Sequence, residues 1–250
     1  MSLLSVEDVS CYFGSLRAVD HVSMTIEPGE LRAVIGPNGA GKTTFFNLIS
    51  GFFPPTAGRI LFNGQDITRR PPHQRVTMGM ARTFQITEVF PELSVRDNVL
   101  IPVEIEAGYQ MRPWLSRAAK ARVGERVDEL ITMGGLTGKA GQLVGELSQG
   151  DQRCTEIIMS LALKPRLLLL DEPTAGMGDQ ETYDITQLIR KLHRDHDALS
   201  MVLIEHDMRV IFRLAQRIMV LAEGRVLAEG TPGEIAASED VQAAYLGKSK

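Results

Sequence analysis

Residues 36–43 read GPNGAGKT, a glycine-rich stretch with a lysine and a threonine at its end. It matches the pattern G-x-x-x-x-G-K-[ST] and lies between the strand-like LRAVI at 31–35 and the helix-compatible TTFFNLIS at 43–50. The glycines let the backbone turn so tightly that consecutive N–H groups point inward, and the following helix adds the positive end of its dipole. The sequence therefore predicts a loop that holds phosphate oxygens between a strand and a helix.

The residue types inside this loop suit a nucleoside triphosphate and a divalent cation. Lys42 is placed to reach the β- and γ-phosphates, and the hydroxyl of Thr43 is placed to take a Mg²⁺ position. The alternative is a glycine-rich turn that carries a lysine by chance, and the strand before it and the helix after it argue against that. The residues expected to contact the nucleotide are Gly36, Asn38, Gly39, Ala40, Gly41, Lys42, Thr43 and Thr44.

An acidic pair ends a second apolar run, LLLLDE at 167–172. Asp171 is placed to hold Mg²⁺, directly or through water, and Glu172 to orient or deprotonate an attacking water. An apolar strand that ends in Asp-Glu is by itself more often a structural edge. Because open α/β sheets bring such loops to one carboxyl edge, the phosphate loop favours a functional role for this pair.

Strand and helix signals alternate along much of the chain. Short β-rich runs separated by Gly, Pro and Asp fill the N-terminal part, and apolar runs return at 167–170, 200–205 and 217–222. The stretch DQETYDITQLIRKLHRDH at 179–196 separates the first two of these runs and predicts a crossover helix. This alternation predicts a mostly parallel sheet with helical connections.

The middle of the chain has a different pattern. Val123, Val127, Leu130 and Ile131 recur at helical spacing, and strand signals vanish between about 88 and 160. This part of the sequence is expected to form a helical subdomain beside the sheet.

Composition narrows the class of protein. The 250 residues, 44% of them hydrophobic, can fill one large domain or a core with a subdomain. A net charge of -4 and scattered Lys and Arg give no basic stripe, so no nucleic-acid partner is expected. Cys11 and Cys154 fit no metal or redox spacing. With no run near the ~20 apolar residues of a membrane span and no signal-peptide pattern, the chain is expected in the cytosol.

Five motifs in a fixed order carry a family resemblance. GPNGAGKTT, Gln85 in ARTFQ, LSQGDQR at 147–153, LLLLDEP and His206 in LIEHD together resemble the ATP-binding subunit of ABC transporters. The stretch 79–101, the DEPTAGM run, GTPGEI at 230–235 and the AYLG near the C-terminus are similar to the branched-chain amino-acid branch of that family, with its urea and amide relatives.

The resemblance implies an α/β fold: a P-loop NTPase core with a mostly parallel sheet, an N-terminal antiparallel β subdomain and a helical subdomain. The whole chain is then one ABC ATPase domain. Residues 1–87 and 161–230 are expected to form the nucleotide-binding core with its β subdomain, 88–160 the helical subdomain, and 231–250 a helical C-terminal tail.

The resemblance also implies that two ATPase subunits pair head to tail. The signature loop, LSQGDQR at 147–153, then covers ATP that is held in the phosphate loop of the other subunit. Ser148 can cap a helix whose N-terminus, together with the backbone of Gly150, faces a γ-phosphate. Without the resemblance, LSQGDQR would be interpreted as an ordinary helix start.

Further roles follow from matching positions in the family pattern. Phe13 is expected to stack on adenine, with Tyr12 as the alternative. Gln85 is expected to touch Mg²⁺ or water and to join the core to the helical subdomain, and His206 to contact the γ-phosphate and position the water. By themselves, such residues are more often part of a core, a loop or a surface. The catalytic set is thus Glu172, His206 and Gln85, and the metal set is Thr43, Gln85 and Asp171.

Two departures from the family pattern leave roles open. The common LSGGQ appears here as LSQGD, which keeps Ser148 and Gly150 but adds Asp151, and this extra carboxylate is expected to weaken ATP affinity slightly. The loop after DEPT reads AGMGDQ instead of carrying a leucine-aspartate pair, so the role of Asp179 stays open.

The resemblance implies the ATP-hydrolysing subunit of an ABC importer for branched-chain amino acids or related small polar solutes. Its partners would be a second ATPase subunit, identical or paralogous, transmembrane permease subunits, and indirectly a solute-binding protein. The permease would dock near Gln85, with Val89, Phe90, Pro91 and Leu93 as groove residues or internal packing, and hold the chain at the inner face of the cell membrane. The alternatives are the ATPase of a lipopolysaccharide or lipid exporter and, from another class, a soluble ATP-driven switch.

Overall fold

The larger of two sheets forms the centre of the protein. The computed structural model describes residues 2–83, 89–109 and 116–246. The strands of the larger sheet lie in the order β10-β9-β3-β8-β7-β6. Strands β6, β7, β8, β3 and β9 are parallel and β10 pairs antiparallel with β9, which confirms the mostly parallel sheet that the sequence predicts. Their bounds are β3 (Leu31–Ile35), β6 (Met80–Arg82), β7 (Leu167–Asp171), β8 (Ser200–Ile204), β9 (Arg217–Ala222) and β10 (Arg225–Gly230).

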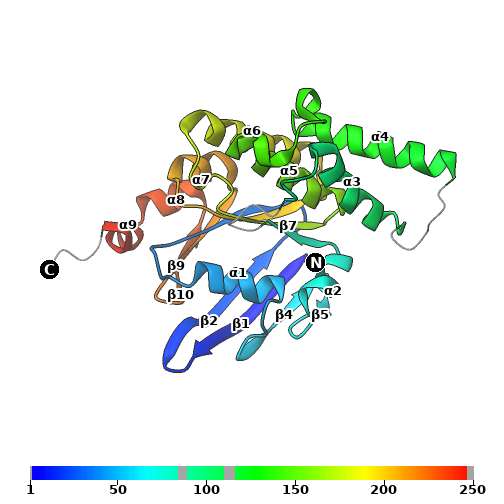
Figure 1. Cartoon of the computed structure of the whole chain (residues 1–250). Helices are drawn as coiled ribbons and strands as arrows, with labels where there is room; N and C mark the ends of the chain where they lie inside the picture. Colours follow the sequence, from blue (N-terminus) through cyan, green and yellow to red (C-terminus); the bar gives the residue numbers. More distant parts are fainter. Residues whose placement is uncertain (1, 84–88, 110–115, 247–250) are drawn as a thin grey trace.

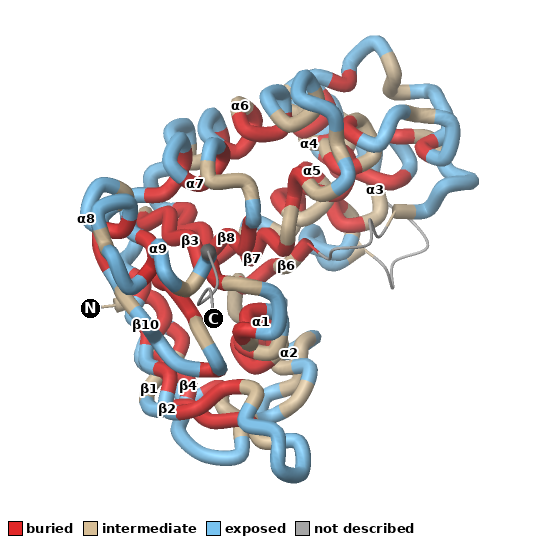
Figure 2. The backbone as a smooth tube through the Cα atoms, turned by 90° about the vertical axis from the view of Figure 1, so that its left-hand side faces the viewer, coloured by how far each residue is buried: buried red, intermediate tan, exposed pale blue. Residues whose placement is uncertain are grey.

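Alternate residues of the central strands point into two separate cores. Leu168 and Leu170 of β7 belong to a core that the helices cover, whereas Leu167 and Leu169 belong to a core that they share with the smaller sheet. Because both faces are covered, every residue of β3, β7 and β8 is buried, and these strands are mostly apolar in sequence, with the buried Arg32 as an exception within β3. Figure 2 shows these strands buried between the two layers.

The smaller sheet is antiparallel and has the order β2-β1-β4-β5. It packs on the same face of the central sheet as α1 (Figure 1). The fold class expected from the sequence, an α/β core with an antiparallel β layer and helices, is therefore confirmed. The bounds are β1 (Leu4–Phe13), β2 (Leu16–Ile26), β4 (Ala57–Phe62), β5 (Gln65–Asp66), α1 (Lys42–Ser50) and α2 (Pro72–Thr77).

Helices α3, α4 and α5 pack together on the other face of the central sheet (Figure 1). The residues Val123, Val127, Leu130 and Ile131 of α4 are all buried, as their helical spacing predicts. Helix α6 forms the crossover connection from β7 to β8, as predicted. The remaining bounds are α3 (Val95–Glu106), α4 (Arg117–Met133), α5 (Gln149–Ala162), α6 (Asp179–Asp195), α7 (Met208–Leu214), α8 (Pro232–Ala237), α9 (Glu239–Leu246) and the short 3₁₀ turns Thr137–Lys139 and Val144–Glu146.

No helix in the described part of the chain is both long and apolar enough to cross a membrane. Three short strands, β5, β6 and β10, were not expected from the sequence. Strand β6 has only three residues and lies at the edge of the sheet beside β7, so its β character comes from this pairing and not from a local pattern.

A buried arginine closes the turn after α1. The Arg75 side chain is 2% exposed, and its guanidinium donates to the carbonyls of Leu48 and Ile49 at the end of α1 and to those of Ile67 and Arg70. Burial lowers the pKa of Arg75 to about 10. One guanidinium thus joins the end of α1 to the segment 67–70, where the Leu48 and Ile67 carbonyls also accept from the N–H groups of Gly51 and Arg70.

Arg75→Met is expected to destabilise the protein by about 3 kcal/mol or more, because several buried carbonyls lose their donor together. Urea unfolding followed by circular dichroism measures this change. Arg69→Met, at an exposed arginine six residues earlier, is the matched control and is expected to cost less than about 0.5 kcal/mol. Equal unfolding midpoints for the two variants would contradict the role of Arg75.

Candidate functional site

The loops that carry the candidate residues meet at one edge of the central sheet. Strand β8 pairs in parallel with both β3 and β7, so the carboxyl ends of all three strands lie side by side. The phosphate loop follows β3, Asp171 ends β7, and His206 follows β8 two residues after Ile204. This confirms the expectation that the phosphate loop and the Asp-Glu pair share one edge.

Two glycines of the phosphate loop have no room for a side chain. A Cβ on Gly36 would lie 2.1 Å from the carbonyl oxygen of Leu221, and a Cβ on Gly41 would lie 2.2 Å from that of Ala18. Gly41 also has a φ of 97°, which L side chains rarely adopt, and it is the N-cap residue of α1. The loop is therefore fitted closely against β9 and the β1–β2 hairpin.

Several amides of this loop are left without protein acceptors. The N–H groups of Gly39, Gly41 and the first three residues of α1, 42–44, have no acceptor among the described residues, whereas the Ala40 N–H donates to the Pro37 carbonyl. Unpaired amides at a helix N-terminus, next to the positive end of the dipole, form an anion site. The backbone thus has the donors that phosphate oxygens require.

Lys42 lies beneath this loop with its ammonium group held in place. Its Nζ donates to the carbonyl oxygens of Gly36 at 2.7 Å and Pro37 at 3.1 Å, and the residue is 6% exposed. Burial lowers the pKa of Lys42, and the carboxylates of Glu172 and Asp171 oppose that shift. These contacts fix a buried positive charge beside the loop amides.

One cavity of about 560 Å³ brings most of the predicted residues together. The phosphate-loop residues 38–44 line it together with Glu172 and His206. Ser148 and Gly150 do not line it, nor does Phe13, and Gln85 lies outside the described residues. The cavity lining also includes Leu16, Arg17, Ala18 and Glu223, which the sequence analysis did not predict.

Glu172 and His206 form a pair at the mouth of this cavity. The Nε2 atom of His206 lies 2.9 Å from Oε1 of Glu172, and the two side chains are 43% and 16% exposed. Glu172 has a φ of 46°, an uncommon value for a non-glycine residue, and its N–H donates to the carbonyl of Ile204. After this turn, the Glu172 carboxylate contacts His206, and Glu172 lines the cavity together with the phosphate loop.

Asp171 lies behind this pair and is bound by an arginine. Its Oδ2 accepts a hydrogen bond from Nη2 of Arg82 at 2.7 Å, with both side chains almost fully buried. The other terminal nitrogen of Arg82 donates to Asn47 and Ser50 of α1. Arg82 therefore joins β6, β7 and α1, and no local sequence signal singled it out.

Thr43 and Asp171 present oxygen atoms, which are the ligands that Mg²⁺ prefers. The Thr43 side chain is exposed and lines the cavity, whereas Asp171 ends β7, is 3% exposed and is not among the residues that line the cavity. The third expected ligand, Gln85, lies outside the described residues. The described oxygen donors fit the cation in chemistry.

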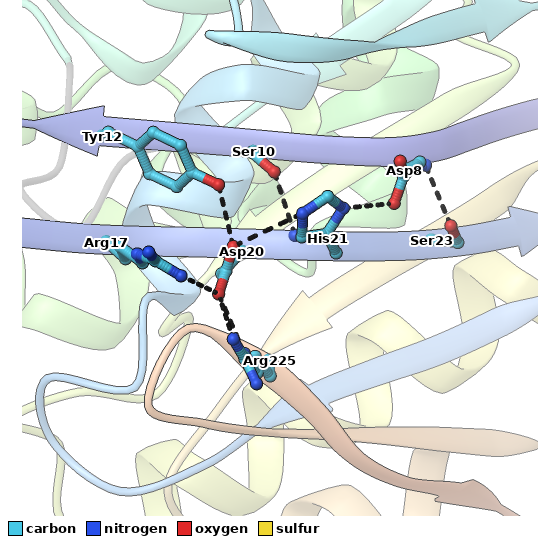
Figure 3. A network of polar contacts seen from close by, with 8 residues as sticks. All are labelled: Asp8, Ser10, Tyr12, Arg17, Asp20, His21, Ser23 and Arg225. Carbon is cyan, nitrogen blue, oxygen red and sulfur yellow. Dashed lines mark hydrogen bonds and ion pairs between the residues drawn. The ribbon is translucent and has the colours of Figure 1, made fainter.

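A polar network supports the phosphate loop from the side of the small sheet (Figure 3). The carboxylate of Asp20 is 2% exposed and accepts hydrogen bonds from the Tyr12 hydroxyl at 2.8 Å and from two nitrogens of Arg225. The hydrogen bonds of Arg225 and then Tyr12 hold the pKa of Asp20 at about 2. The Asp20 N–H donates to the Gly224 carbonyl. The Gly224 N–H donates in turn to the Ala40 carbonyl in the phosphate loop. The network thus joins β2 and the β9–β10 turn to the loop.

The two candidate adenine partners have different environments. The Tyr12 hydroxyl bonds to Asp20, and the Arg17 guanidinium lies 5.8 Å from the centre of its ring. Phe13 is 52% exposed at the end of β1, and its ring packs edge-on against Phe53. Phe13 is therefore the more accessible of the two, although neither lines the cavity.

The signature loop begins α5 on a different surface. Ser148 is the N-cap residue and accepts from the N–H of Asp151, as predicted. The Gly150 N–H donates to Oε1 of Glu181, in the first turn of α6, at 3.1 Å. In one protomer, the phosphate loop and the signature loop therefore do not share a cavity.

Comparison with known proteins agrees with this geometry. Residues 19–175 match the profile of the ABC transporter family, and residues 225–250 match that of the branched-chain amino acid ATP-binding cassette transporters. A relative from Escherichia coli (strain K12), the high-affinity branched-chain amino acid transport ATP-binding protein LivG, is 38% identical, and the match covers 99% of this chain and 98% of the relative.

Solved structures show the same fold. An ATP-binding cassette of an ABC transporter in its ADP conformation aligns with a TM-score of 0.85 at 27% identity, covering 99% of this chain and all of that one. A dimeric post-hydrolysis cassette bound to ADP and Pi aligns with a TM-score of 0.76 at 26% identity, covering 92% of this chain and 98% of that one.

Arg82→Met is expected to destabilise the fold by about 3–5 kcal/mol, because it leaves the buried carboxylate of Asp171 without its cation. Urea unfolding measures the loss. The control is Arg59→Met, because Arg59 forms its ion pair with Glu7 at the surface, and it is expected to cost at most about 1 kcal/mol. An Arg82→Met protein as stable as this control would show that the buried pair adds nothing.

Asp20→Asn is expected to lower stability in a pH-dependent way. Because the folded-state pKa is about 2 and the unfolded value is about 4, the contribution of Asp20 is fully present above pH 4 and is lost as pH falls through 2. The difference between the urea midpoints of wild type and variant should therefore be constant from about pH 7 to 5 and shrink below about pH 4. A difference independent of pH would refute this assignment. Asp197→Asn, at an exposed carboxylate outside this network, serves as the control.

Proposed function

This chain belongs to the ABC transporter family, and we propose that it is the ATP-hydrolysing subunit of an importer for branched-chain amino acids or related small polar solutes. The observation that carries the proposal is the cavity in which unpaired loop amides, Lys42 and the Glu172–His206 pair converge. Hydrolysis of a nucleoside triphosphate requires hydrogen-bond donors that hold the phosphate oxygens and, beside them, a carboxylate that can orient water. The resemblance of the C-terminal segment to the branched-chain amino acid cassettes supports the solute class.

In this proposal the phosphate loop and Lys42 bind the β- and γ-phosphates. Glu172 orients the attacking water and accepts its proton, and His206 holds the Glu172 carboxylate in place through their 2.9 Å contact and faces the γ-phosphate. Thr43 and Asp171 would hold Mg²⁺, which neutralises phosphate charge when it is bound. Phe13 would stack on the adenine ring, because its ring is exposed and lies in the same hairpin as Arg17, which lines the cavity.

Two copies, or one copy and a close paralogue, would complete two such sites. Each protomer has a phosphate loop with its catalytic pair and, on another surface, a capped helix N-terminus at Ser148. In a head-to-tail pair, the signature loop of one subunit would cover nucleotide held by the other. The solved relative bound to ADP and Pi is dimeric, which supports the pairing of two such subunits.

An exposed apolar patch suits a membrane partner. Phe90 is 50% exposed, Leu93 36% and Leu143 41%, and Ser94 pairs with Leu143 to bring the two segments together. The buried Asn98 holds this loop by exchanging two hydrogen bonds with the backbone of Phe90. We propose this patch as the permease docking surface. Val89 packs against the helical core, which matches the alternative of internal packing for that residue.

Glu172→Gln is expected to lower kcat for ATP hydrolysis by about 100-fold or more, because the amide cannot accept the proton of the attacking water. ATP binding is expected to persist, and size-exclusion chromatography with light scattering should show an ATP-dependent dimer. Full phosphate release by this variant would remove Glu172 from the proposed role.

Lys42→Ala is expected to abolish Mg·ATP binding in titration calorimetry, because the loop loses its buried charge. Lys164→Ala is the control, since Lys164 pairs with Glu106 outside the cavity, and it should bind ATP as the wild type does. Wild-type affinity in the Lys42→Ala protein would contradict the proposed phosphate site.

A further inference from the structure

A buried carboxylate next to His206 has no part in the roles assigned so far. Glu205 follows the last residue of β8 and is 4% exposed. Among the described residues, no Lys, Arg or His side chain lies within ion-pair distance of it. An ionised carboxylate without a cation is costly to bury unless hydrogen bonds satisfy its oxygens. The Glu205 carboxylate therefore needs hydrogen-bond donors around both of its oxygens.

Both oxygens of Glu205 accept hydrogen bonds, and the donors belong to two different loops. Oε1 accepts from the N–H of Thr174 at 2.9 Å and from its hydroxyl at 2.5 Å. Oε2 accepts from the N–H of His206 at 2.9 Å. Thr174 is itself 7% exposed and lies two residues after Glu172. One carboxylate thus joins the turn after β7 to the loop after β8.

These bonds close a ring of contacts around the catalytic pair. The backbone runs from Glu172 to Thr174, the Glu205 carboxylate connects Thr174 to His206, and the His206 ring returns to the Glu172 carboxylate. The Glu172 N–H adds a second bond to β8 through the carbonyl of Ile204. Because the ring is closed, the distance between Glu172 and His206 depends on the position of Glu205.

We propose that Glu205 is a positioning residue for hydrolysis, which holds the turn of Glu172 and the loop of His206 at the separation that their contact requires. This proposal rests on the proposed function, because it concerns the same site. Glu205 does not line the cavity and acts only through the other two residues. A misplacement of about 1 Å in such a pair lowers turnover far more than binding.

Glu205→Gln tests the proposal because glutamine keeps the size but has only one acceptor oxygen. Its amide group then faces either the Thr174 donors or the His206 N–H, so one half of the link is lost. In the full-length protein with Mg·ATP, kcat is expected to fall about 10- to 100-fold while the Kd for ATP stays within about twofold. A kcat within twofold of wild type, or a parallel loss of kcat and ATP affinity, would overturn the proposal.

Coupling to Glu172 separates positioning from general stability. If Glu205 acts through Glu172, adding Glu205→Gln to a Glu172→Gln protein should lower the residual rate no further. If Glu205→Gln slowed the Glu172→Gln protein by the same factor by which it slows the wild type, the proposal would be overturned. Glu30→Gln is the matched control: Glu30 is also buried and hydrogen-bonded, to Arg32, at the far end of β3, and this variant should keep the wild-type kcat.

If Glu205→Gln does not fold, two substitutions at Thr174 test whether its hydrogen bonds to Glu205 support turnover. Thr174→Val removes only the hydroxyl donor and is expected to lower kcat about threefold to tenfold, whereas Thr174→Ser keeps both donors and should retain wild-type turnover. Equal kcat for the two variants would overturn the proposal. A wild-type protein that released no phosphate would instead contradict the proposed function and would leave these comparisons without a baseline.

Discussion

The structure depends on one constraint: β3, β8 and β7 are adjacent and parallel. Each strand is only five residues long and fully buried, so the residues that line the cavity can lie only beyond its end. Parallel pairing puts the three carboxyl ends at one edge, and there the phosphate loop, the Asp171–Glu172 pair and His206 meet. The two apolar cores on either face keep the strands in register, so packing far from the cavity sets the geometry inside it.

The charged groups at this edge are buried, and hydrogen bonds or an ion pair hold each of them. Lys42 is held by two carbonyls beneath the loop, Asp171 by Arg82, and Glu205 by three donors from its neighbouring loops. Buried charges are expensive, but hydrogen bonds that satisfy every oxygen also restrict the side chain to one position. A site that must place a water and a phosphate within fractions of an ångström benefits from this restriction.

The structure of one protomer also explains why a second subunit is proposed. The cavity lining ends at the phosphate loop, the hairpin residues 16–18 and the catalytic pair, and it leaves the helix N-terminus at Ser148 elsewhere. In this protomer the Gly150 N–H, which would face a phosphate in the proposed dimer, is bound to Glu181. The contact shows that this amide is a competent donor to an anionic oxygen.

The sequence by itself determined the fold class, the phosphate loop, the acidic pair and the order of the motifs, because these depend on local patterns: glycine spacing, apolar runs and capping residues. It did not reveal Arg82, Glu205 or the Asp20 network, because each has a partner far along the chain: Arg82 and Asp171 are 89 residues apart, Glu205 and Thr174 are 31 apart, and Asp20 and Arg225 are 205 apart. Only the tertiary structure decided which charges are buried and which donors meet them. Burial and long-range pairing depend on how the layers pack, and no short stretch of sequence encodes that.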